Sequence, residues 1–206
     1  NFVEVDANIF YPRLDMAGER PGITGTEFPL LNYLIYLFSL LFGYDHWYGR
    51  LINLVVSSFG TYFFYLIVKR FFSGRNAFIS TLLLLGSIWF SYSRKVMPDT
   101  FSASLCLIGL HQGLQFLYNP RYKYLVLFGI FSTIGVLSKI PAIIILSPLI
   151  IPLADSSVVK KHKWALATMG SLSLAITGWW YYYWVPYLVE TYGYWHYYMG
   201  KSIKEG

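Results

Sequence analysis

Basic residues recur at every second junction between the hydrophobic segments of this chain. Apolar stretches cover residues 47–68, 76–93, 98–118, 122–138, 141–154 and 164–185. Three of the junctions between them are basic and alternate with two that hold sparse, mixed polar groups. The basic junctions contain Lys69, Arg70, Arg75, Arg121, Lys123, Lys160, Lys161 and Lys163. Because cytoplasmic loops of membrane proteins carry an excess of Lys and Arg, this alternation predicts repeated crossings of a bilayer, with the basic junctions inside.

The composition favours the same class of protein. Charged residues make up 13% of the 206 residues and hydrophobic residues 56%, and the mean hydropathy is +0.47, whereas about a quarter of a soluble domain is charged. The net charge of +6 is concentrated in short junctions, which indicates membrane topology and not nucleic-acid binding. We therefore predict an all-α fold: a polytopic transmembrane helical bundle of about six spans plus one juxtamembrane helix, surrounded by membrane lipids.

The bundle is expected to have three regions. Residues 1–27, rich in proline and glycine, predict an external loop. Residues 28–43 form an apolar run of roughly 24 Å, which is short of a hydrocarbon core of about 30 Å. We expect there a juxtamembrane helix that does not cross the bilayer, with Pro29 in its first turn. Residues 44–206 complete the bundle. Prolines within 141–154 predict a kinked or tilted helix, and the aromatic run at 179–184 is either an interfacial belt or a sugar-stacking platform.

The polar residues suited to chemistry lie on the side opposite the basic junctions. Asp99 is a base, a metal ligand or a substrate clamp, or it caps the helix that follows. Lys139 either anchors the chain at the headgroups or binds a lipid phosphate as a point charge. Glu27 either joins these residues or caps the next helix. Arg94 lies close before Asp99 in the sequence, and Arg50 pairs with either a lipid phosphate or a loop acid.

Short motifs along the chain resemble those of membrane glycosyltransferases of the GT-C superfamily. The resemblance is strongest to bacterial members of the dolichyl-phosphate-mannose protein mannosyltransferase and aminoarabinose transferase type, and it extends from about residue 2 to 155. It is carried by Phe10-Tyr11-Pro12-Arg13-Leu14-Asp15, Gly25-Thr26-Glu27-Phe28-Pro29-Leu30, Gly49-Arg50-Leu51, Tyr92-Ser93-Arg94, Met97-Pro98-Asp99 and Ser138-Lys139-Ile140-Pro141.

The resemblance implies an enzyme of the bacterial inner membrane that moves a sugar from a polyprenyl-phosphate donor to an acceptor on the outer face. It implies that Glu27 and Asp99 are catalytic and that Arg94 and Lys139 bind the donor phosphate. Some relatives use a divalent metal, so a metal cofactor is left open, as are the acceptor and a partner in a membrane complex. In the family an aspartate follows the first span, and we expect the chain as given to lack both.

Two other functions compete with this one. A non-catalytic membrane scaffold or assembly subunit would keep the same fold without chemistry. A transporter for a lipid-linked sugar would show inverted repeats and charges at mid-membrane depth. The apolar segments here carry neither acids nor bases in their centres except His111, which argues against transport.

Overall fold

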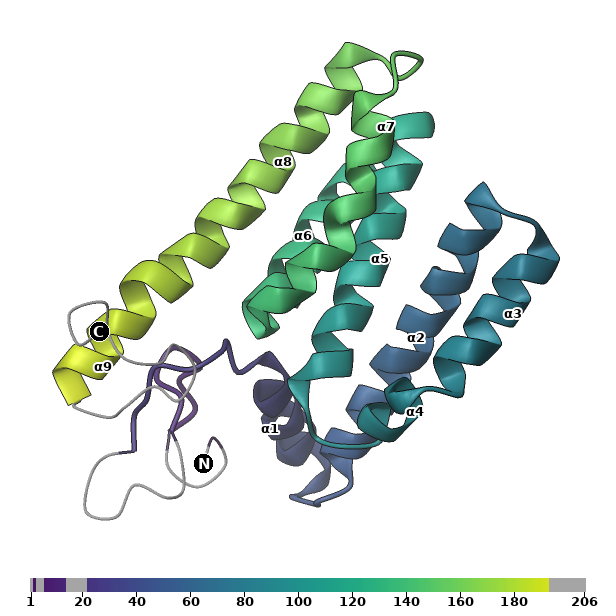
Figure 1. The fold of residues 1–206 in the computed structure, drawn as a ribbon. Coiled ribbons are helices and arrows are strands. Elements are labelled where there is room, and N and C mark those ends of the chain that lie inside the picture. Colours follow the sequence, from purple (N-terminus) through teal and green to yellow (C-terminus); the bar gives the residue numbers. More distant parts are fainter. Residues whose placement is uncertain (1, 3–5, 14–21, 193–206) are drawn as a thin grey trace, which may run out of the picture.

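The computed structural model describes residues 2, 6–13 and 22–192, and within them every regular element is a helix (Figure 1). Leu14 and Asp15 of the first motif, like residues 193–206 of the expected bundle, lie outside the described residues. The elements are α1 (Leu30–Phe42), α2 (Tyr48–Phe71), α3 (Gly74–Leu85), α4 (Ile88–Ser93), α5 (Pro98–Tyr118), α6 (Tyr122–Ser138), the 3₁₀ helix η1 (Ile140–Leu149), α7 (Ile150–Ala154), α8 (Lys160–Gly178), the π-helical η2 (Trp179–Trp184) and α9 (Val185–Tyr192).

The helices follow the apolar segments of the sequence, with two interruptions. The segment expected as one span at 76–93 is divided into α3 and α4, and the Ser87 hydroxyl between them accepts a hydrogen bond from the Trp89 amide. The proline-rich segment at 141–154 is a 3₁₀ helix followed by the short α7, which fits the irregularity that its prolines predict. Pro29 occupies the cap position of α1, one residue before the expected first turn.

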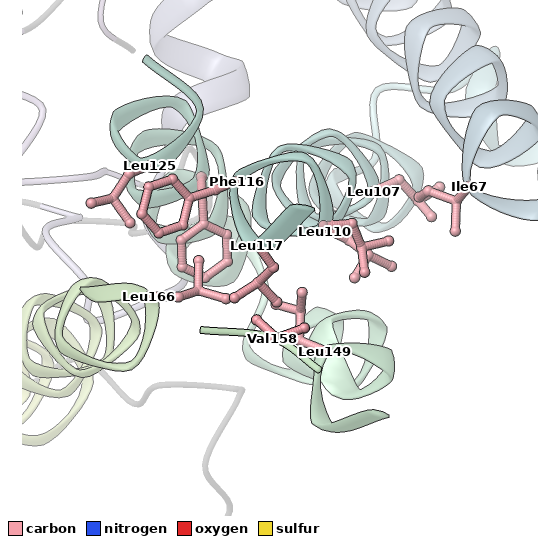
Figure 2. Close-up of a cluster of buried hydrophobic side chains, with 11 residues drawn as sticks. Ile67, Leu107, Leu110, Phe116, Leu117, Leu125, Leu149, Val158 and Leu166 are labelled. Carbon is pink, nitrogen blue, oxygen red and sulfur yellow. The ribbon is translucent and has the colours of Figure 1, made fainter. Parts of the chain in front are cut away.

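Helix α5 is the centre of the bundle, and most of its residues are buried between α2, α6 and η1. Figure 2 shows one part of this core, where Ile67 from α2, Leu110 from α5 and Leu166 from α8 belong to one cluster of buried side chains. Helix α2 reaches α5 closely because Gly60 has no side chain. A Cβ atom there would collide with both the side chain and the backbone of Ser104.

The connections between helices alternate between the two ends of the bundle. The α2–α3, α5–α6 and α7–α8 connections, which carry the basic residues, lie at one end, whereas the α4–α5 and α6–η1 turns lie at the other end with α1 (Figure 1). Among the described helices, α2 alone is both long enough and apolar enough to cross a bilayer. Helices α1, α3 and α6 and the combined η1–α7 segment are apolar but shorter.

Candidate functional site

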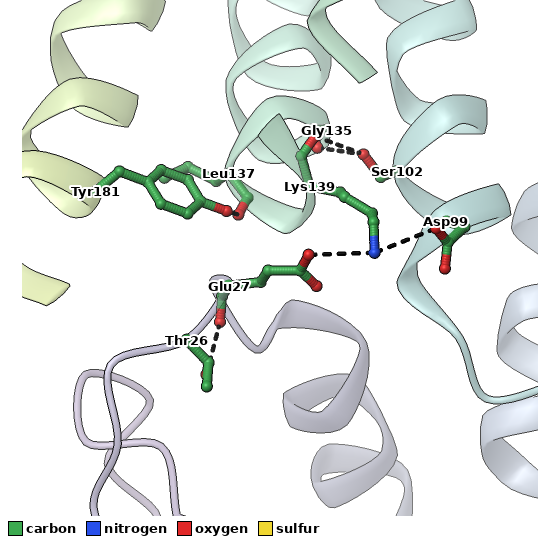
Figure 3. Close-up of polar contacts among 8 residues, drawn as sticks. All are labelled: Thr26, Glu27, Asp99, Ser102, Gly135, Leu137, Lys139 and Tyr181. Atoms are coloured by element: carbon green, nitrogen blue, oxygen red, sulfur yellow. Dashed lines mark hydrogen bonds and ion pairs between the residues drawn. The ribbon is translucent and has the colours of Figure 1, made fainter. Parts of the chain in front are cut away.

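Lys139 lies between two carboxylates from distant parts of the chain. Its Nζ atom is 3.2 Å from Glu27 Oε1 and 3.2 Å from Asp99 Oδ1 (Figure 3). The side chains of Glu27, Lys139 and Asp99 are 20%, 28% and 39% exposed, so all three are partly sheltered but open to solvent. We call these three residues the ion-paired cluster. Three of the four site residues expected from the sequence are thus brought together at one end of the bundle.

Asp99 is in the first turn of α5 but does not cap it. The cap residue is Met97, followed by Pro98 at the first helical position, and the Asp99 carboxylate faces Lys139. An acidic residue there still interacts favourably with the positive end of the helix dipole. The capping interpretation for Asp99 is therefore wrong, whereas its contact with a cation is direct.

The turn before Asp99 is held by the fully buried side chain of Asn53 on α2. Its Nδ2 atom lies 2.7 Å from the Lys95 carbonyl oxygen and 3.2 Å from that of Met97. Its Oδ1 atom accepts hydrogen bonds from Ser57 and Thr100. We did not single out Asn53 from the sequence. An asparagine inside an apolar helix was the available signal, since a buried amide needs hydrogen-bonding partners.

Lys139 directly follows α6, which ends at Ser138, and is its C-cap residue next to α5. The Ser102 hydroxyl of α5 donates to the carbonyl of Gly135, at 2.6 Å, and approaches that of Lys139, at 3.4 Å. A Cβ atom on Gly135 would lie 2.7 Å from Cys106 Sγ, so the glycine permits this close contact of the two helices. The Lys139 backbone is therefore fixed to the same helix that carries Asp99.

Glu27 is placed by hydrogen bonds that join the segment before α1 to α6 and η2. The Leu137 carbonyl accepts from the Phe28 amide at 3.1 Å and from the Tyr181 hydroxyl at 2.8 Å. Trp180 Nε1 donates to the Thr26 carbonyl at 3.1 Å. Because α1 begins at Leu30, two residues beyond Phe28, and the Glu27 side chain bonds Lys139, the capping interpretation for Glu27 is also wrong.

Trp180 and Tyr181 are only 1% exposed and pack with Leu137 and Val185 in a separate part of the core. Neither an interfacial belt nor a sugar-stacking platform describes these two residues. They anchor the Glu27 segment instead. The neighbouring Trp179, Tyr182 and Tyr183 remain exposed.

The cluster shifts the proton affinity of two of its members. Burial raises the pKa of Glu27, the Lys139 charge and hydrogen bond partly oppose this, and the Asp99 charge adds to the rise. Burial alone would lower the pKa of Lys139, but the hydrogen bonds and charges of Asp99 and Glu27 outweigh it and raise the pKa. Lys139 therefore stays charged at neutral pH, and Glu27 is more basic than an ordinary glutamate.

A cavity of about 280 Å³ adjoins the cluster, with Glu27 in its wall. Its polar lining includes Arg13, Thr24, Asn32 and Ser138, and Arg13 also forms an ion pair with Asp6 at 3.4 Å. The volume is near the lower end of the range for ligand pockets, roughly 300–1,000 Å³. The cavity therefore has room for one small polar group beside the carboxylate.

Arg94 is not part of this arrangement. Its guanidinium lies 4.6 Å from the centre of the Phe90 ring and lines another hollow, with Arg50 and Lys95. The part of the chain that the structure describes contains no group of three or more His, Cys, Asp or Glu side chains suited to a metal ion.

The chain was compared with models of known protein families. The model for the dolichyl-phosphate-mannose-protein mannosyltransferase family matches residues 21–182, a range that includes Glu27, Asp99 and Lys139. No curated protein and no solved structure matches the chain. Since the family model covers most of the sequence, the chain belongs to the dolichyl-phosphate-mannose-protein mannosyltransferase family, which consists of GT-C-type membrane glycosyltransferases.

Proposed function

We propose that this protein transfers a sugar from a polyprenyl-phosphate donor to an acceptor at the outer face of the membrane. The observation that carries the proposal is the ion-paired cluster, in which Lys139 lies 3.2 Å from each of two carboxylates. The cluster adjoins a cavity with polar lining and lies within the part of the chain that matches a family of membrane glycosyltransferases.

The chemistry of a lipid-linked donor suits this arrangement. A polyprenyl chain is too apolar to leave the bilayer, so its phosphate is met at the headgroup level. As the bond between sugar and phosphate oxygen breaks, negative charge grows on the departing phosphate, and a nearby cation stabilises it. We assign this role to Lys139, whose compact ammonium acts as a point charge for phosphate.

The two carboxylates receive different roles in the proposal. Glu27 is the less exposed, and its raised pKa makes it the better acceptor for the proton that the attacking hydroxyl or amine loses. Asp99, on the rigid first turn of α5, retains Lys139 when Glu27 takes up a proton. The cluster then keeps one cation and one anion, so the departing phosphate meets less negative charge.

A divalent metal needs oxygen ligands around a vacant position. Here the ammonium of Lys139 fills the position between Glu27 and Asp99. These residues fit a cation-bridged pair of carboxylates better than a metal site, and no step of the proposed reaction is assigned to a metal.

The proposal also fixes an orientation in the membrane. About six spans cross the bilayer, α1 lies along the surface as a juxtamembrane helix, and the basic end of the bundle faces the cytoplasm. The ion-paired cluster and the described residues that lead into α1 then face outward, in a bacterial inner membrane. The alternation of connections between the two bundle ends supports this orientation.

Replacement of Lys139 tests the catalytic proposal. In the full-length protein, Lys139→Gln should reduce sugar transfer by roughly 100-fold, as when one charge-stabilising group is lost. Lys139→Arg should not restore the rate, because a planar guanidinium does not replace a point charge. Lys123→Gln, an exposed lysine at the opposite end, is the matched control. Normal transfer by Lys139→Gln would refute the role of Lys139.

A membrane scaffold is the second candidate function. It is favoured by the same contacts, since Lys139 joins three segments and could serve structure alone. A scaffold predicts that Lys139→Gln lowers the melting temperature and weakens binding to a membrane partner. An enzyme predicts loss of transfer with a melting temperature near that of the unmodified protein.

A further inference from the structure

A second hollow, of about 810 Å³, opens beside the turn between α4 and α5. Three cations line it: Arg50 from the first turn of α2, and Arg94 and Lys95 from the turn. The remaining lining residues are Trp47, Leu51, Leu54, Ser91 and Val96. We call this the basic hollow. Within the described residues it shares only Val96 with the cavity beside Glu27.

Within the part of the chain that the structure describes, no acidic side chain neutralises the positive charge of the basic hollow. Among the described residues, Arg50, Arg94 and Lys95 form no ion pair, and no acid lines the hollow. Arg94 and Lys95 instead lie over the rings of Phe90 and Tyr92. A cation in the first turn of a helix is opposed by the helix dipole, so Arg50 is not explained by the stability of α2. Together these features favour an anionic ligand.

The turn that carries Arg94 and Lys95 is held in place by Asn53 of α2. Asn53 binds the carbonyl of Lys95 itself and, two residues on, that of Met97. Arg94 and Lys95 therefore extend from a backbone that is anchored to the buried face of α2. Because the turn is already ordered, less conformational entropy is lost when a ligand binds, and this favours affinity.

The hollow is apolar along one side. Leu51 and Leu54 lie one turn apart on α2, and Leu54 is four residues beyond Arg50, or about 6 Å further along the helix. Trp47, a residue type that prefers the headgroup level, lies before them. Charge at one end and apolar surface at the other match an amphiphile whose head is anionic.

We propose that the basic hollow binds the phosphate headgroup of an anionic membrane phospholipid, with an acyl chain along Leu51 and Leu54 of α2. The volume admits a headgroup with its glycerol and exceeds what a lone phosphate needs. The inference rests on the membrane location of the family and not on sugar transfer, because Lys139 lies in a different part of the bundle end.

Native mass spectrometry of the detergent-purified full-length protein tests this. It would be titrated separately with phosphatidylglycerol, phosphatidylcholine, polyprenyl phosphate and inorganic phosphate. Each basic residue near a membrane surface is worth about fivefold in affinity for anionic lipid, and three about 100-fold. The triple variant Arg50→Gln/Arg94→Gln/Lys95→Gln should lose about that factor for phosphatidylglycerol. The control Arg75→Gln/Lys160→Gln/Lys161→Gln removes equal charge at the other end of the bundle, more than a Debye length of about 10 Å away. It should retain the tightest phosphatidylglycerol binding within about threefold.

Several outcomes would overturn the proposal. Equal losses in the two triple variants would mean that only net charge matters. Equal binding of phosphatidylcholine would mean that the headgroup charge is not recognised. If the first triple variant lost binding of polyprenyl phosphate and retained binding of phosphatidylglycerol, the hollow would serve the sugar donor. Displacement of bound phosphatidylglycerol by inorganic phosphate would indicate a site for free phosphate. Should the triple variant melt early, Arg50→Gln and Arg94→Gln alone must each still weaken phosphatidylglycerol about fivefold.

Discussion

Replacing Asn53 tests whether one buried side chain on α2 holds the turn that precedes Asp99. Asn53→Asp keeps the size and shape of the side chain, so it opens no cavity. It replaces the amide nitrogen, which faces the carbonyls of Lys95 and Met97 at 2.7 and 3.2 Å, with an oxygen. The ionised aspartate has no donor, and the protonated form has one where the amide had two.

The loss of folding free energy depends on which carbonyl groups lose their hydrogen-bonding partner. The Tyr92 carbonyl, 3.3 Å from the Asn53 amide nitrogen, also accepts from the Lys95 amide and stays satisfied. The carbonyls of Lys95 and Met97 are the two that depend on Asn53. A buried acceptor left unsatisfied costs about 1–3 kcal/mol, so the variant should lose roughly 2–6 kcal/mol of folding free energy.

Thermal unfolding in detergent measures this loss. At about 2–4 °C per kcal/mol for a chain of this size, a central loss of about 4 kcal/mol lowers the melting temperature by roughly 8–16 °C. Asn76→Asp is the matched control, because Asn76 is exposed in the first turn of α3, where a negative charge is tolerated. If Asn53→Asp melted within about 2 °C of the unmodified protein, Asn53 would not hold the turn.

Three further predictions concern packing, pH and topology. Gly60→Ala should destabilise the protein by about 1–3 kcal/mol, because the added methyl group overpacks the contact with Ser104. Gly170→Ala on α8, where the methyl group meets open space, should be neutral or stabilising by up to about 1 kcal/mol. Equal unfolding midpoints of the two variants would contradict this prediction. Because the pKa of Glu27 is raised in the fold, its contribution to stability is present below the ordinary value of 4.5 and is lost as pH rises through the raised value. At pH 7, Glu27→Gln should therefore melt no lower than the unmodified protein. It should transfer sugar more slowly by about 100-fold or more, because the base is lost. A lower melting temperature would show that ionised Glu27 stabilises the fold. In a background without the native cysteine, an impermeant thiol reagent added outside should label a cysteine at position 95 and not one at position 73, and the reverse pattern would invert the proposed orientation.

The sequence was sufficient for the features that depend on local composition. Long apolar runs with few charges predict helices, and the alternation of basic junctions predicts that successive connections lie at opposite ends of the bundle, as they do. The same alternation placed Asp99 and Lys139 at a common end, and the expectation that residues 28–43 do not cross the bilayer placed Glu27 there as well. The motifs around them also indicated the family that the comparison identifies.

Local patterns were less informative where a residue had two plausible roles. Asp99 and Glu27 both precede or begin helices, so capping was an open interpretation of each. Only the positions of Met97 and Pro29 at the actual cap sites exclude it. Trp180 and Tyr181 have the composition of an interfacial belt. Trp180 instead contacts Thr26 and Phe28, more than a hundred residues away in the sequence, and Tyr181 bonds the Leu137 carbonyl of α6.

What the sequence determined by itself is the class of the protein: helices, their approximate limits and the end of the bundle at which each charge lies, because hydropathy and charge act within a few residues. Tertiary structure alone decided which charges meet. Lys139, far from Asp99 in the sequence, joins Glu27 and Asp99, while Arg94, only five residues before Asp99, lines the basic hollow. That choice depends on how closely α2, α5 and α6 approach, which is set by the missing side chains of Gly60 and Gly135 and by the buried amide of Asn53. Such contacts join residues far apart in the chain, and no local pattern encodes their geometry.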